Sequence, residues 1–313
     1  MNAFGLFLAS IFSLLNLTQL AAVHEALFSF EDVNEATVLF AGDMMFDRSV
    51  RTAGERNGED FLLSCVSGAL ADADLTVANL EGPITDNPSR SVGSAIGSPD
   101  NFIFTFPRST APLLKKHHID LVSLGNNHIL NFGYSGVRTT QEALQDAGVG
   151  YFGDPIGDTV TLRTVNGILF AFIAYNEFAP GGWRAAASST ALQIREAKFA
   201  GFVPIVFPHW GVEYEPLASE YQRTLAHQFV DAGAVAVIGA HPHVVQDHET
   251  YNGAPIYYSL GNFVFDQYFT EAVRNGIFVK ITFNTTGATK VEEIPIVLNR
   301  DRTVCPAMVD KVI

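Results

Sequence analysis

The chain has 313 residues, of which 48% are apolar and 17% are charged, a composition typical of a globular protein and not of a disordered one. Its length suits one large α/β domain or two smaller ones. The net charge is −14, from 19 Lys and Arg against 33 Asp and Glu. No basic surface is apparent that would bind a polyanionic backbone, so we expect no nucleic-acid partner.

The first 30 residues are expected to form a leader ahead of a folded domain at residues 31–313. Residues 4–23 are mostly apolar and uncharged, which favours a signal peptide or a single membrane anchor, and therefore an exported or anchored protein facing outside. The first basic residue is Arg48, so the positively charged start of a typical signal peptide is missing. A helix packed on the domain, in a cytoplasmic protein, is the alternative.

From residue 36 onward, apolar strands alternate with helices of 3.6-residue periodicity. Strands are predicted at 37–43, 74–81, 120–128, 159–165, 168–175, 201–211 and 234–241, and helices at 59–73, 109–119, 134–149, 189–199 and 217–233. Segments 244–265, 275–284 and 290–299 have the turn-separated pattern of antiparallel strands. The loop at 83–107 is long enough to be a functional flap. This order predicts an α/β protein with a mixed sheet or two packed sheets.

The two cysteines, Cys65 and Cys305, are far apart and form no CxxC pair. We therefore expect neither a disulfide framework nor a thiolate zinc site. The pattern favours one buried thiol and one near the C-terminus.

Five of the predicted strands end in polar side chains of metal-ligand type. These are Asp43; Glu81; Asn126, Asn127 and His128; His209; and His241 and His243. The carboxyl ends of strands in an α/β sheet gather ligands. Carboxylates, amide oxygens and neutral imidazoles bind Zn, Mn, Fe or Mg. About six ligands are too many for one four-coordinate ion, which favours two ions bridged by a carboxylate.

Each of these residues also has a purely structural interpretation. Asp43 and the paired asparagines are residue types that cap helices and turns, and Glu81 precedes a Gly-Pro turn. His128 and His209 could be hydrogen-bonded or stacked core histidines. His241 and His243, two residues apart after an apolar run, are the strongest candidates for ligands.

The motif series GDMMFDR, NLEGP, GNNH, HWGVEYEP, GAHPHVVQ and SLGNFVFDQ resembles the CapA family, which is linked to poly-gamma-glutamate capsule synthesis. The resemblance covers residues 36–267. It implies a domain similar to the calcineurin-like metallophosphoesterase fold, a two-sheet sandwich flanked by helices in α-β-β-α layers. Such a domain would hold one or two divalent metal ions.

The resemblance also implies roles for the polar residues. Asp43 and His243 would bind the first metal, and Glu81 would bridge, where the phosphoesterase pattern usually has Asp. The second metal would be bound by Asn127, His209 and His241. His128 would protonate the leaving oxygen or hold a phosphate. Four further residues are expected, on their own chemistry, to bind substrate or orient the ligands: Arg48, Asn126, Glu213 and Asn262. Arg48 could equally form a salt bridge, Asn126 could cap the following turn, and Glu213 could lie at the rim.

One position departs from the pattern, because Met45 occupies the place of a histidine that would bind the first metal. Asp47 is the nearest alternative ligand in the sequence.

Three functions follow as expectations, the third of which is a cytosolic nucleotidase-like enzyme if residues 4–23 form a packed helix. The first is a metal-dependent, phosphoesterase-like hydrolase acting on a phosphoester or an anionic polymer in capsule or envelope synthesis. The second is a noncatalytic, metal-binding component of a capsule assembly complex with membrane partners. The fold alone does not decide between them.

Overall fold

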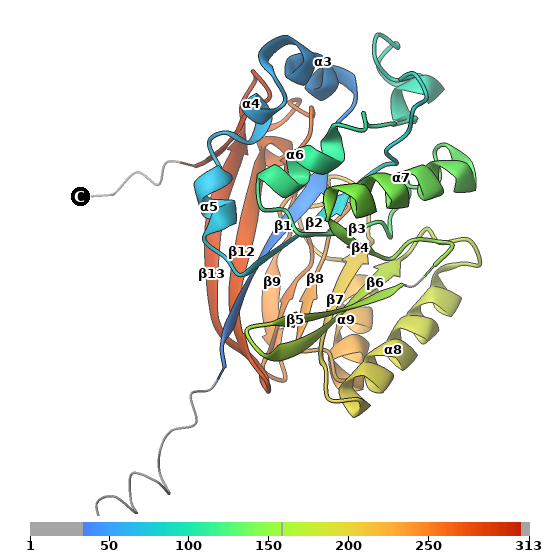
Figure 1. The fold of residues 1–313 in the computed structure, drawn as a ribbon. Coiled ribbons are helices and arrows are strands. Elements are labelled where there is room, and N and C mark those ends of the chain that lie inside the picture. The colour runs from blue at the N-terminus through green and yellow to red at the C-terminus, as the bar shows by residue number, and fades with distance from the viewer. Residues whose placement is uncertain (1–33, 158, 308–313) are drawn as a thin grey trace, which may run out of the picture. The chain divides into compact units, whose positions relative to one another are not determined.

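A computed structural model of the chain describes residues 34–157 and 159–307. Two β-sheets lie face to face, and helices cover the outer face of each (Figure 1). This confirms the predicted α-β-β-α fold class. The predicted leader lies outside the described residues. Within the described part of the chain, no helix has the length and apolar character needed to cross a bilayer.

The first sheet has eight strands and contains both parallel and antiparallel pairs. Its order is β14 (Val304–Pro306), β13 (Gly287–Leu298), β12 (Asn275–Asn284), β1 (Ala36–Met44), β2 (Leu75–Leu80), β3 (Leu121–Ser123) and β4 (Gly150–Phe152), with β11 (Asn262–Val264) also pairing with β1. Strands β1 to β4 are parallel, and β12 to β14 form the antiparallel side. The carboxyl ends of the parallel strands therefore meet along one edge.

The second sheet has six strands, and its centre is parallel. Its order is β5 (Val160–Val165), β6 (Ile168–Asn176), β7 (Val203–His209), β8 (Ala236–Ile238), β10 (Ala254–Tyr257) and β9 (His248–Tyr251). Strands β6, β7, β8 and β10 are parallel, while β5 and β9 close the two edges in antiparallel fashion.

Strand β1 is apolar along most of its length because it is buried on both faces. Val38 and Phe40 face the core between the sheets, whereas Leu39 and Ala41 pack beneath the outer helices. This alternation follows from the two-residue period of a strand. Phe207 of β7 joins Phe40 in the core between the sheets, so the central strands of both sheets are held against each other.

The outer helices divide between the two sheets. Those over the first sheet are α3 (Arg48–Asn57), α4 (Asp60–Leu63), α5 (Ser67–Ala71), α6 (Thr110–Lys116) and α7 (Gly133–Ala147); those over the second are α8 (Trp183–Phe199) and α9 (Glu220–Ala232). Two short elements, η1 (Pro99–Phe102) and α10 (Glu271–Arg274), lie in loops. The single helix predicted at 59–73 is wrong, because residues 64–66 interrupt it and leave two short helices.

Cys65 and Cys305 form a disulfide, so the expectation of two separate thiols is also wrong. The bond joins the segment between α4 and α5 to β14, across 240 residues of sequence. The two residues come together only when the antiparallel side of the first sheet has formed, and their spacing carries no local signal of this.

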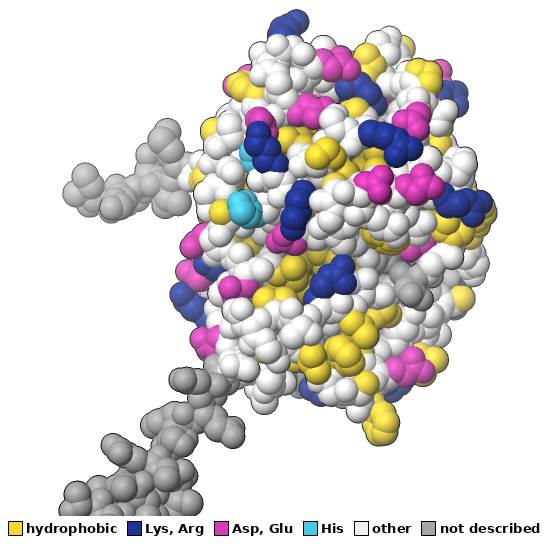
Figure 2. All heavy atoms as spheres, in the orientation of Figure 1, with side chains coloured by type: hydrophobic (Ala, Val, Ile, Leu, Met, Phe, Trp, Pro, Cys, Tyr) yellow, Lys and Arg dark blue, Asp and Glu magenta, His cyan; other side chains and the backbone are white. Residues whose placement is uncertain are grey.

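Acidic and basic side chains are interleaved on the face that carries α6 and α7 (Figure 2). Ion pairs at α6 or just before it include Arg108 with Asp86 and Lys116 with Asp60. Although the chain carries a net charge of −14, this face shows no single acidic patch that would repel an anionic partner.

Candidate metal centre

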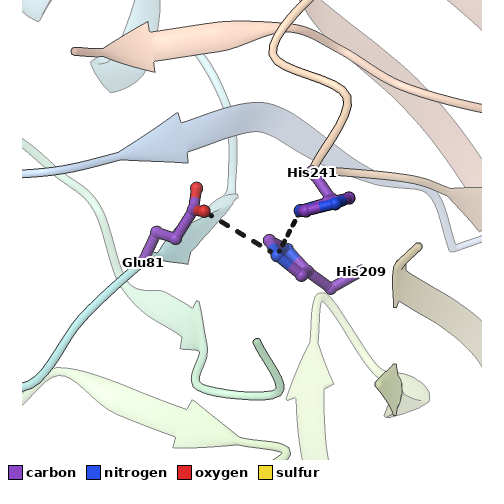
Figure 3. Close-up of side chains that lie close together, drawn as sticks. All are labelled: Glu81, His209 and His241. Atoms are coloured by element: carbon purple, nitrogen blue, oxygen red, sulfur yellow. Dashed lines mark hydrogen bonds and ion pairs between the residues drawn. The ribbon is translucent and has the colours of Figure 1, made fainter. Parts of the chain in front are cut away.

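The polar residues predicted at the strand ends converge at one edge of the two sheets. Asp43 lies at the end of β1, Glu81 follows β2, His209 ends β7 and His241 comes three residues after β8. Figure 3 shows Glu81, His209 and His241 pointing toward one another from three separate segments. All four side chains are buried. The fold thus gathers at one place residues that are spread widely along the sequence.

Two glycines allow the strand ends to pack this closely. A Cβ atom on Gly42 would lie 1.9 Å from the carbonyl oxygen of Gly261, and one on Gly239 would lie 2.1 Å from that of Tyr258. Any larger residue would push the neighbouring backbone away. The glycines directly before Asp43 and shortly before His241 therefore fix where those side chains enter the site.

Glu81 is the central carboxylate of the site. It is fully buried, and neither of its oxygens has a hydrogen-bond partner among the described residues. Its Oε1 atom lies 3.8 Å from Nε2 of His209 and 3.7 Å from Nε2 of His243. An unpaired buried carboxylate costs several kcal/mol, on the order of the desolvation penalty for a buried ion. A cation between Glu81 and the imidazoles would remove that cost, so the residues fit a bound metal.

The first half-site for such an ion consists of Asp43, Glu81 and His243, whose ligand atoms all lie within 4.8 Å of one another. Nδ1 of His243 is 3.3 Å from Oδ2 of Asp43. The other oxygen of Asp43 accepts a hydrogen bond from the Asn79 amide at 2.8 Å. This half-site therefore presents two carboxylates and one imidazole.

The second half-site is built around His209. Its Nε2 atom lies 3.0 Å from Oδ1 of Asn127 and 3.1 Å from Nδ1 of His241. Around an octahedral ion with bonds of about 2.1 Å, adjacent ligand atoms lie about 3 Å apart. The two imidazoles and the amide expected to bind the second metal thus have the spacing of adjacent ligands, and Oε1 of Glu81 lies 3.8 Å from Nε2 of His209. We call the two halves together the metal centre.

The backbone is strained where the two neighbouring histidines enter the site. His241 has a φ of 101° and His243 a φ of 58°, values that non-glycine residues rarely adopt. Such residues cost about 1–3 kcal/mol each and concentrate at functional sites. Both strained residues are buried in the metal centre, which supports a role for them beyond packing.

The imidazoles of His209 and His241 are held neutral. Burial lowers the pKa of His241 to about 3 and that of His209 well below its ordinary value. Burial, together with the charge of Asp43, raises the pKa of Glu81 well above its ordinary value. Neutral imidazoles keep the lone pairs that metal binding requires, while Glu81 needs a nearby cation to ionise.

His128 lies at the edge of the metal centre, with Nε2 3.9 Å from Oε1 of Glu81. Its ring rests on Phe104, with the centroids 4.3 Å apart, and its Nδ1 is 3.2 Å from Oδ1 of Asn131. Since Asn131 Oδ1 can only accept, Nδ1 donates and Nε2 carries the lone pair. Burial lowers the pKa of His128 to about 4, so the side chain is neutral at pH 7.

Asn126 acts as a loop cap and does not face the half-sites. Its Oδ1 accepts hydrogen bonds from the backbone N–H groups of His128 and Ile129. Its Nδ2 donates to Oδ1 of Asn79 at 3.1 Å. Asn126 thus fixes the turn that presents Asn127 and His128.

Asn79 is a site residue that the sequence prediction missed. Its Nδ2 contacts both Oδ1 of Asp43, at 2.8 Å, and Nδ1 of His209, at 3.2 Å, so one amide links ligands of both half-sites. The sequence did hold a signal for this residue, namely a polar amide within an otherwise largely apolar strand. All six residues of β2 are buried. Buried amides need partners, and the partners here are the candidate ligands.

Met45 and Asp47 do not enter the metal centre. Met45 is fully buried in the core beneath the outer helices. Asp47 accepts hydrogen bonds from Arg51 Nε at 3.0 Å and from the Thr105 backbone at 2.9 Å, so it is not a substitute ligand.

The remaining predicted residues surround the centre. Arg48 forms an ion pair with Asp266 at 2.6 Å and lies over the ring of Phe104. Asn262 Oδ1 lies 2.9 Å from Nδ1 of His243, and the Glu213 carboxylate lies within 4.8 Å of ligand atoms of His241 and His243. Glu213 is exposed, whereas Asn262 is fully buried.

A helix-flanked two-sheet protein with a buried carboxylate and imidazole centre is the class that this fold and site define. Residues 37–267 match the family described as "Bacterial capsule synthesis protein PGA_cap", and the chain belongs to this CapA-type family. The match spans all the strand-end residues of the metal centre.

Related proteins carry names from capsule synthesis. The chain is 29% identical over 282 residues to "PGA biosynthesis protein CapA" of Bacillus subtilis (strain 168), covering 85% of this chain and 72% of that protein. It is 28% identical over 278 residues to "Capsule biosynthesis protein CapA" of Bacillus anthracis, covering 83% and 67%. Among solved structures, TT1561 of Thermus thermophilus overlaps 80% of this chain and 99% of that chain, with 11% identity and a TM-score of 0.45. This overlap carries no argument for function.

Proposed function

We propose that this chain is a metal-dependent, phosphoesterase-like hydrolase that acts in the synthesis of a poly-gamma-glutamate capsule or a related envelope polymer. The observation that supports it best is Glu81, a buried carboxylate with no hydrogen-bond partner among the described residues, facing the imidazoles of His209 and His243. Bound divalent ions, Mn, Fe, Zn or Mg, would stabilise negative charge on the reacting oxygens.

The chain's own residues would hold and orient the reacting groups. Asp43, Glu81 and His243 would hold one ion, and Glu81, Asn127, His209 and His241 the other. Asn79 keeps Asp43 and His209 in place through its amide. The lone pair on Nε2 of His128 faces the centre, where it can accept a hydrogen bond from a substrate oxygen.

Because its pKa is lowered to about 4, neutral His128 takes up a proton only weakly in the absence of substrate. An anionic substrate beside the ring would raise this pKa, because a nearby negative charge favours the imidazolium form. His128 would then take a proton from the attacking water and give it to the leaving oxygen.

A noncatalytic, metal-binding component of a capsule assembly complex is the second candidate. The burial of Met45 in the core supports it, because the first half-site lacks the histidine that the phosphoesterase pattern provides. Metal would then stabilise the fold by linkage without supporting turnover.

The two candidates are separated by assays on metal-replete protein. Phosphate release from a phosphomonoester, alcohol release from a phosphodiester, and new amine ends from poly-gamma-glutamate would each be measured with and without a chelator. The hydrolase proposal expects turnover that chelation abolishes and that His128→Ala lowers by about 10²–10⁴-fold with metal still bound. His248→Ala, an exposed histidine on β9, is the matched control. Metal binding without turnover on any substrate would favour the noncatalytic candidate.

We also propose that the protein is exported. Disulfides persist in oxidising compartments, and the bond between Cys65 and Cys305 supports this location together with the apolar segment at 4–23. Cell fractionation, with thiol labelling before and after reduction, tests it. Recovery in the cytoplasmic fraction with two free thiols would contradict export.

A further inference from the structure

The first half-site is short of one ligand, and the two nearest residues in sequence cannot supply it. The sulfur of Met45 accepts a hydrogen bond from the Asp47 backbone at 3.0 Å inside the core. The carboxylate of Asp47 is bound to Arg51 and to the Thr105 backbone. Any further protein ligand must therefore come from another segment.

Glu213 is the acidic side chain that reaches both half-sites from the solvent side. Its carboxylate lies within 4.8 Å of ligand atoms of His241 and His243. These two histidines belong to different half-sites, and both are buried, whereas Glu213 is exposed. Oε1 of Glu81 lies 3.7 Å from Nε2 of the same His243, but Glu81 is fully buried.

The loop that carries Glu213 is tied to the histidine segment. The backbone N–H of Tyr214 donates to the carbonyl oxygen of Pro242, the residue between the two histidines, at 2.8 Å. The hydroxyl of Tyr214 accepts a hydrogen bond from Nε2 of Gln267 at 3.1 Å. These contacts on the neighbouring residue keep Glu213 beside the metal centre.

The hydrogen bond between Asn262 and His243 determines which ring nitrogen of His243 is free to bind an ion. Nδ2 of Asn262 has three acceptors around it: the carbonyl oxygens of His243 and Val273, at 3.3 and 2.9 Å, and Oε1 of Gln267, at 3.0 Å. Its Oδ1 therefore faces Nδ1 of His243, which must donate at 2.9 Å. Nε2 of His243 is left with the lone pair, on the side of Glu81.

We propose that Glu213 supplies a carboxylate ligand to the metal centre on its solvent side, beside His243, in place of the missing histidine. This inference rests on the proposed metal binding. A further carboxylate makes the ligand set richer in oxygen, which suits a hard ion such as Mn²⁺ or Mg²⁺ better than Zn²⁺. The half-site around His209, with two imidazoles, remains the one that takes softer ions.

The test is a Mn²⁺ titration of the metal-free protein by calorimetry, compared among wild type, Glu213→Gln and Glu215→Gln. Glu215 is exposed on the same loop and is the matched control. We expect two Mn²⁺ ions per chain in wild type and in Glu215→Gln. In Glu213→Gln, one ion should bind at least about tenfold more weakly, since even outer-shell changes cost that much. The magnetic coupling between neighbouring ions in the electron paramagnetic resonance spectrum should then appear only at correspondingly higher Mn²⁺ concentration.

Two results would overturn the inference while leaving metal binding intact. One is a single ion in the saturated wild type, and the other is two ions held as tightly in Glu213→Gln as in wild type. If the wild type binds no ion, the proposed function fails as well. Because Glu213 is exposed, the metal-free variant should unfold at the wild-type temperature, which separates loss of a ligand from loss of the fold.

Discussion

Nε2 of His209 lies 3.0 Å from Oδ1 of Asn127, although 82 residues separate the two in sequence. His209 ends a strand of the second sheet, and Asn127 follows β3 of the first, so the contact joins the two sheets at their shared edge. The Asn79 amide donates to Nδ1 of His209, so without metal Nε2 donates to Oδ1 of Asn127. Both atoms are of types that bind a cation, and a bound ion would replace this hydrogen bond and displace the proton on Nε2.

Asn79 should be needed for metal affinity although it need not bind the metal. Asn79→Ala removes the amide between Asp43 and His209, and we expect metal affinity to fall by about 10–100-fold. Calorimetric titration measures this. Asn101→Ala, which removes another buried amide bonded to Ser94, controls for the loss of a buried hydrogen bond. Equal affinities in the two variants would refute the positioning role.

Glu81→Gln should stabilise the metal-free protein and abolish tight metal binding. The pKa of Glu81 is higher in the folded protein than in the unfolded chain. The contribution of Glu81 to stability is therefore fully present at pH values below its pKa in the unfolded chain. That contribution is lost as the pH rises through its pKa in the folded protein. A neutral amide avoids this loss. The melting temperature of metal-free Glu81→Gln should exceed that of wild type near neutral pH, with a gap that narrows as pH falls toward the unfolded pKa of about 4.3. A variant less stable than wild type throughout this range would contradict the account.

The buried histidines should give the opposite pH dependence. Burial lowers the pKa of His241 to about 3 and that of His128 to about 4. Their contribution to the free energy of unfolding is therefore fully present above a pH of about 6.5, their pKa in the unfolded chain. It is lost as the pH falls through their pKa values in the folded protein. His241→Asn keeps a residue type that tolerates positive φ. Its melting temperature, measured without metal as the pH is lowered from 6.5 to about 4, should fall less steeply than that of wild type. An equal or steeper slope would count against a neutral His241.

The disulfide should contribute measurably to stability. Cys65→Ala should lower the free energy of unfolding by about 2–5 kcal/mol, because the cross-link closes a long loop in the unfolded chain. Urea denaturation of wild type and variant, each with and without reductant, gives the difference. Reductant should lower the stability of wild type alone. If reductant does not change wild-type stability, the bond has no such role.

The sequence predicted the strands and their polar ends because these signals are local. Apolar runs such as β1 and β7 are buried on both faces, and each run is followed by a polar residue at the strand's carboxyl end, Asp43 or His209. The parallel order then brings these ends together.

Features that depend on tertiary contacts escaped prediction. Cys65 and Cys305 meet only through the assembled sheet, and the segment around Cys65 breaks a helix that its apolar spacing favoured. Asn79 was hidden within an apolar strand, although its polarity there was a usable signal. The positive φ angles of His241 and His243 are imposed by their surroundings and not by their residue types.

The most direct test of the metal centre is elemental analysis of purified, metal-replete protein, comparing wild type with the His241→Ala/His243→Ala double variant. The double variant removes one imidazole from each half-site. We predict close to two divalent ions per chain in wild type, and loss of both in the variant. No bound metal in the wild type, or the same metal content in both proteins, would contradict the account and leave these histidines as structural residues.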